Sequence, residues 1–89
     1  MGTLEKLRVT VAALRQAAGQ SQADLAAGVG LTQEKVSRRQ SGVTAWTLDE
    51  VDLLAGHFRI PVLTLLAGPT VACEALESPV GPVAAGQDR

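Results

Sequence analysis

Residues 20–42 read QSQADLAAGVGLTQEKVSRRQSG, and this stretch predicts two short helices joined by a tight turn. In the first helix, Ser21 stands three residues before Asp24, an arrangement that resembles the capping box at a helix start. Apolar side chains then recur at helical spacing over about two turns. Gly30 ends this helix, at a position where a left-handed backbone is often needed. These signals predict a helix over residues 21–29.

The second helix of the pair has an unusual composition. Thr32 is suited to cap its start and Gly42 to close its end, which predicts a helix over residues 33–41. Val36 is its only apolar residue, so the helix cannot lie deep in a core. At about 100° per residue, its hydrogen-bonding side chains gather within an arc of roughly 140°. These side chains are Gln33, Glu34, Ser37, Arg38 and Ser41. Such a face is either simply solvated or suited to recognising a partner.

Apolar periodicity predicts three more helices around this pair. A helix over residues 4–18 precedes it, with Thr3 as the expected cap and Gly19 at the end. A helix that begins after Thr47 follows it, and a short helix over residues 62–67 comes next. The expected core-facing side chains of the two longer helices are Leu4, Leu7, Val11, Leu14 and Ala18 in the first and Leu48, Val51, Leu54, Ala55 and Phe58 in the second.

The apolar pattern thins beyond Pro69. Residues 70–77 are expected to add a turn or two of helix, and residues 78–89, with two prolines and two glycines, are typical of a flexible tail. The chain is therefore predicted to be all-α. It is expected to form a compact domain of five helices over residues 1–69, followed by an extension over residues 70–89 that is partly disordered or supports a dimer.

The composition argues against several classes of protein. Apolar residues make up 46% of the chain, enough for one small core. With His57 and Cys73 as the single residues of their types, the chain has neither an internal disulfide nor a Cys/His metal cluster. The apolar run around residues 60–67 is too short to cross a bilayer, and the chain shows no secretory signal, catalytic set or phosphate-binding loop. We therefore expect a cytoplasmic protein with no membrane partner, metal, cofactor or enzymatic activity.

Charge is distributed unevenly along the chain. Residues 1–46 carry six basic against three acidic residues, a net charge of +3. Residues 47–89 carry two against six, a net charge of −4. The formal net charge of −1 would by itself argue against a nucleic-acid partner. The asymmetry indicates instead that the two halves face different partners, or that one faces a polyanion and the other faces water.

Residues 20–37 resemble the helix-turn-helix of phage repressors and Cro proteins, the xenobiotic-response-element type. The Gln-Ala-acid-Leu-Ala block, the turn residue Gly30, the Thr-Gln start of the second helix and Gly42 carry this resemblance, which extends over about residues 4–68. It implies a five-helix, lambda-repressor-like domain that binds double-stranded operator DNA as a homodimer. It also implies a prokaryotic or phage protein associated with the nucleoid.

The resemblance further assigns residues to DNA contacts. The positions that match the family's base-reading residues are Gln33, Glu34, Ser37 and Arg38, whose chemistry suits adenine, cytosine and guanine edges. Gln22 and Arg15 match positions near the DNA backbone. Lys35 and Arg39 are expected to contact DNA phosphates or solvent, and Thr44 is expected to contact the DNA backbone.

Three features depart from the family pattern. Arg39 stands where the family usually has an apolar or aromatic residue. Gln40 stands where it often has a Glu that pairs with the Arg at the position of Arg15, and we expect Gln40 to hydrogen-bond Arg15 without adding charge. The loop Val43 to Trp46 lacks basic residues that commonly grip phosphate. Few phosphate contacts imply modest affinity and a shallow salt dependence.

The sequence also predicts a dimer interface and a role for Trp46. Surplus hydrophobicity near the carboxyl end predicts a dimer interface made of Val62, Leu63, Leu66, Val71 and Leu76. Trp46 is expected to cover the small core rather than stack on bases. A second hypothesis keeps the fold but gives it another role, as a protein-interaction module that acts through its acidic carboxyl half. An antitoxin, an anti-repressor and a regulatory adaptor are examples of such a module.

Overall fold

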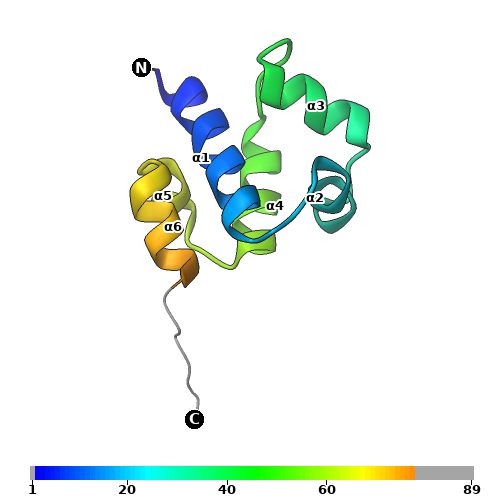
Figure 1. Ribbon diagram of the computed structural model, residues 1–89. Coiled ribbons are helices and arrows are strands. Elements are labelled where there is room, and N and C mark those ends of the chain that lie inside the picture. The colour runs from blue at the N-terminus through cyan, green and yellow to red at the C-terminus, as the bar shows by residue number, and fades with distance from the viewer. Residues whose placement is uncertain (1, 78–89) are drawn as a thin grey trace.

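A computed structural model describes residues 2–77, and all regular elements within that range are helices (Figure 1). They are α1 (Thr3–Ala17), α2 (Gln22–Val29), α3 (Gln33–Ser41), α4 (Leu48–Phe58), α5 (Val62–Leu66) and α6 (Pro69–Glu77). The prediction of an all-α chain is confirmed for these residues. None of the helices in this range combines the length and the apolar character that a membrane crossing requires.

Helix α1 organises the packing. It contacts α3, α5 and α6, while α2 packs on α3 and α4, so the two halves of the chain meet around α1 (Figure 1). One continuous apolar core fills the space between them. Its fully buried large side chains are Leu7, Val11, Leu14, Leu25, Val36, Leu54 and Leu65. Three expected core residues are wrong. Leu4 and Leu48, each near the start of its helix, are 49% and 83% exposed, and Ala18, which follows the last residue of α1, is also exposed.

The predicted capping box at the start of α2 and the predicted turn between α2 and α3 are both confirmed. The Asp24 amide donates to Ser21 Oγ at 3.0 Å and the Ser21 amide donates to Asp24 Oδ2 at 2.9 Å, which completes the capping box. Gly30 adopts a left-handed backbone with φ of 76°, and the Leu31 amide donates to the Ala26 carbonyl at 3.0 Å. This glycine-closed end lets the chain reverse into α3 while the Ala26 carbonyl stays hydrogen-bonded.

One helix cap differs from the prediction. The cap of α1 is Gly2 rather than Thr3, and it makes no side-chain hydrogen bond. Helix α4 ends at Phe58, and its C-cap Arg59 is a non-glycine residue in the left-handed region with φ of 59°. Pro61 is the cap residue of α5.

Helix α6 belongs to the packed unit. Ala72 is fully buried, and Cys73, Ala75 and Leu76 pack against the same core. Gly68, with φ of 118°, and Pro69 turn the chain so that α6 runs back along α1. Packing against the core thus continues past residue 69, as far as Leu76. The predicted tail, residues 78–89, lies outside them.

Candidate nucleic-acid interface

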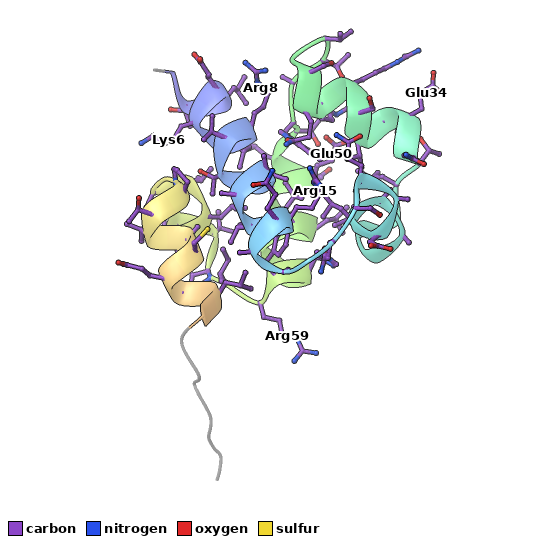
Figure 2. The ribbon with its side chains drawn as sticks, viewed as in Figure 1. Lys6, Arg8, Arg15, Glu34, Glu50 and Arg59 are labelled. Carbon is purple, nitrogen blue, oxygen red and sulfur yellow. The ribbon has the colours of Figure 1, made fainter. Side chains whose placement is uncertain are left out.

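Helix α3 presents the polar face that the sequence predicts. Gln33, Glu34, Ser37 and Arg38 are all exposed, whereas Val36 is fully buried and is the single buried residue of this helix. Figure 2 shows Glu34 pointing away from the body of the molecule at the outer end of the helix. The four predicted base-reading side chains are thus brought together on one outward surface.

Both ends of α3 are closed by local hydrogen bonds. Thr32 Oγ1 accepts from the Lys35 amide at 3.1 Å, as predicted. Gly42, with φ of 85°, ends the helix as predicted, and the Val43 amide donates to the Arg38 carbonyl at 3.1 Å. A side chain at position 42 would also meet Arg8, because an added Cβ would lie 2.8 Å from Arg8 Nη1.

An ion pair ties the carboxyl end of α3 to the start of α4. Arg39 Nε donates to Glu50 Oε1 at 2.8 Å and Arg39 Nη2 donates to Glu50 Oε2 at 2.9 Å, a bidentate arrangement. The two side chains are 15% and 11% exposed, and Arg39 also donates to the Thr44 hydroxyl. The prediction that Arg39 faces solvent or phosphate is therefore wrong, because its planar guanidinium is already matched to a carboxylate.

Glu50 has a second role at the start of α4. The Thr47 amide donates to Glu50 Oε1 at 3.0 Å, and the Glu50 amide donates to Thr47 Oγ1 at 3.1 Å. The Arg39 hydrogen bonds, followed by the Thr47 amide, hold the pKa of the Glu50 carboxyl below its usual range despite desolvation. The Thr-x-x-Glu spacing of residues 47–50 is a readable capping-box signal, but nothing local in the sequence points to Arg39 as the partner.

This ion pair predicts a pH dependence of stability. A carboxyl whose folded pKa lies below its unfolded pKa contributes stability that is fully present above the unfolded value and is lost as the pH falls through the folded one. The Asp24 carboxyl, whose pKa the Ser21 amide lowers, acts in the same direction. We expect the free energy of unfolding of the wild type to fall below about pH 5.

Glu50→Gln isolates the contribution of Glu50 to this acid effect. The variant should be less stable than the wild type at neutral pH, and urea titrations should show this difference shrinking as the pH is lowered, because a protonated Glu50 resembles the glutamine. A difference that stays constant from neutral to acid pH would contradict the assignment.

Gln40 bridges α1, α3 and the following loop. Its Nε2 donates to the Arg8 carbonyl at 3.1 Å, and its Oε1 accepts from Trp46 Nε1 at 3.1 Å. The predicted Gln40–Arg15 hydrogen bond is wrong, because both ends of the amide are used elsewhere. Trp46 is 4% exposed, which confirms its predicted role as a cover over the core. Helix α3 is thus held by Val36, Arg39 and Gln40 together, rather than by the valine alone.

The side chains predicted to contact the DNA backbone differ in how far they are exposed and in how many hydrogen bonds they make within the protein. Arg15 is half-buried, its Nη1 donates to the Gln20 carbonyl at 2.8 Å, and its Nε is buried without a partner among the described residues. Gln22 is half-buried in the first turn of α2, and Thr44 is exposed beside Arg39. Lys35 is exposed on α3. Lys35 is therefore the most accessible cation among the predicted phosphate contacts.

Glu34 and Arg38 form the second ion pair of residues 2–77. Arg38 Nη2 lies 2.9 Å from Glu34 Oε2, one helical turn away, and the side chains of Arg38 and Glu34 are 57% and 74% exposed. An exposed pair of this kind is worth little, about 0.3–0.5 kcal/mol on a helix. Arg38 can therefore exchange this partner for another at low cost.

Only some of the residues predicted to form the dimer interface are exposed in the structure. Val62, Leu66 and Leu76 pack against the chain's own core. Leu63 and Val71 are 81% and 46% exposed. Three of the five side chains are thus occupied within the chain, which weakens the prediction of an apolar dimer surface near the carboxyl end.

Compared with known proteins, the chain matches no family model, no curated protein and no solved structure.

Proposed function

We propose that this protein is a sequence-specific DNA-binding transcriptional regulator, most simply a small repressor, that inserts α3 into the major groove of double-stranded DNA. The observation that carries this proposal is the outward face of α3, where Gln33, Glu34, Ser37 and Arg38 are exposed on a helix closed at both ends. The major groove is wide enough for an α-helix and presents hydrogen-bonding edges that these side chain types can distinguish.

Rigid support of α3 favours recognition over simple solvation. Val36 enters the core, Arg39 is paired with Glu50 on α4, and Gln40 bonds to α1 and Trp46. A helix of nine residues needs tertiary contacts to be stable at all, and these contacts also fix the direction of its outward side chains. A reading helix needs them, because base contacts depend on side chains held in register with the groove.

The proposed interface has few cations. Arg39 is used within the protein, Arg15 is half-buried, and Lys35 and Arg38 remain exposed on α3. Few released counterions give a shallow salt dependence. We therefore expect binding to be modest in affinity and selectivity to come from base contacts.

Two substitutions separate base reading from phosphate attraction. Arg38→Ala should cost about 1–3 kcal/mol of binding free energy on the preferred site and relax selectivity at one base pair. Lys35→Ala should weaken binding to all sequences alike and lower the salt slope by about 1. Binding of both variants to a randomised duplex library would check this division. Identical selectivity changes in the two variants would refute it.

Binding itself is tested by fluorescence anisotropy. A labelled random duplex is titrated with the full chain at low and at moderate salt, and the proposal predicts binding that weakens as salt rises. Absence of binding at low salt would refute it.

A second candidate function, a protein-interaction module, is favoured by the exposed surface of α4. Leu48 and Leu53 are 83% and 45% exposed and lie among the exposed acidic residues Asp49 and Asp52. Under this alternative the chain would ignore duplex DNA at every salt concentration, and Leu48→Ser would remove partner binding. The two functions are compatible, as in a regulator that also binds a protein.

A further inference from the structure

The outward face of α1 carries an unpartnered surface in which apolar and charged side chains alternate. Glu5, Arg8, Val9 and Ala12 follow the spacing of one helix stripe, and Leu4 lies beside it. Leu4 and Val9 are 49% and 43% exposed. The buried side chains of the same helix, such as Leu7 and Leu14, lie on its opposite side. This set of five residues is called the α1 face below.

The α1 face is hollowed rather than convex. A depression of about 270 Å³ is lined by Glu5, Arg8, Val9, Ala12 and Gln40. A neighbouring hollow of about 160 Å³ shares Glu5 and Arg8 and extends past Leu4 to Trp46. Figure 2 shows Arg8 extending from the amino-terminal half of α1. Both hollows are smaller than a pocket for a drug-sized ligand, so this surface is better suited to a macromolecular partner.

The charges of the α1 face are not matched by opposite charges among the described residues. Within residues 2–77, neither Glu5 nor Arg8 belongs to an ion pair. Arg8 Nη1 reaches only the Gln40 carbonyl, at 3.5 Å, which is a long hydrogen bond. A cation and an anion three residues apart on one helix are complementary to an identical helix that runs in the opposite direction.

We propose that the α1 face is an interface with a second copy of this chain. If a two-fold axis crosses α1 midway between residues 5 and 8, Glu5 of each copy lies level with Arg8 of the other, and two equivalent ion pairs form. Leu4 and Val9 lie on either side of these pairs and shield them from water. Glu5 and Arg8, which form no ion pair within residues 2–77, are then each paired with an opposite charge of the other copy.

The dimer formed in this way is weak. Half of one short helix buries much less than the roughly 800 Å² per partner of a standard interface. Association is therefore expected at high protein concentration and to depend on ionic strength. This inference does not rest on DNA binding, and its test contains no DNA.

Charge reversal tests the reciprocal pairing in the full chain. Sedimentation equilibrium of the wild type up to about 1 mM should show the mean mass rising toward that of a dimer. Arg8→Glu alone and Glu5→Arg alone should each weaken association about tenfold or more, because each brings like charges together twice. An equimolar mixture of the two variants should restore it, since one chain then carries two cations and the other two anions.

Controls distinguish this surface from general charge effects. Glu74→Arg changes the net charge of the chain by the same amount as Glu5→Arg, but position 74 lies exposed on α6, so this variant should leave association unchanged. Circular dichroism checks that each variant is folded. A wild type that stays monomeric at the highest concentration, single variants that associate like the wild type, or a mixture that fails to recover would each overturn the proposal.

Discussion

Replacing Arg39 with alanine is expected to lower the free energy of unfolding clearly more than replacing its exposed neighbour Arg38 with alanine. The reason is that Glu50, 11% exposed and bidentately paired with Arg39, would be left as a charge with little access to water. Urea unfolding at neutral pH measures the loss. Because this ion pair also fixes the carboxyl end of α3, proposed DNA binding should weaken further than the loss of one positive charge explains.

A double-mutant cycle distinguishes the ion pair from other effects of truncation. Arg39→Ala, Glu50→Ala and the double variant should be strongly non-additive, because the second substitution removes a charge that the first left unpaired. The neighbouring Arg38→Ala is the matched control, since its exposed pair with Glu34 should change stability by less than about 0.5 kcal/mol. Additive losses at positions 39 and 50 would show that the pair is not what holds α3 to α4.

Gly28→Ala is expected to destabilise the protein by about 1–3 kcal/mol, although alanine is the better helix former by about 1 kcal/mol. An added Cβ would lie 2.2 Å from His57 Cε1 and 2.4 Å from His57 Nδ1, so the imidazole would have to leave its place over α2. That movement also breaks the contact between His57 Nε2 and Gln20 Oε1, 2.8 Å apart. Thermal or urea unfolding measures the change.

Two further variants show whether the contact with His57 is the cause. Gly56→Ala is the control, because Gly56 is an exposed residue of α4 with nothing near its Cβ position, and the substitution should stabilise by about 0.5–1 kcal/mol. His57→Ala should remove the penalty, so that Gly28→Ala becomes neutral or stabilising in that background. A Gly28→Ala loss that persists without the imidazole would mean that the crowding lies elsewhere.

Local signals explain why much of the fold can be predicted from the sequence. Each helix cap acts on backbone groups only a few residues away, so the residue and its effect lie in the same short stretch of sequence. Such caps are Ser21, Thr32 and Thr47 at helix starts and Gly30 and Gly42 at helix ends. The same holds for the polar face of α3, which follows from helical spacing alone. Gly28 is different, because its need for a small residue comes from His57 on another helix.

The anchors of α3 could not be predicted for the same physical reason. Arg39 meets Glu50 eleven residues later, and Gln40 meets the Arg8 carbonyl thirty-two residues earlier. Such partners depend on how α1, α3 and α4 cross, which apolar periodicity does not specify. The family pattern even pointed to the wrong partner for Gln40. The packing of α6 is hard to predict because small residues such as Ala72 give a weak apolar signal while they pack closely on α1.

Amide chemical-shift mapping of the isotope-labelled full chain with a duplex selected from a random DNA pool would show which surface meets DNA. The proposed function predicts that the largest shifts fall on residues 33–38 and on Gln22, with small shifts on α5 and α6. Saturating duplex at low salt that leaves the amides of residues 33–38 unmoved, or that shifts only those of α4, would contradict it.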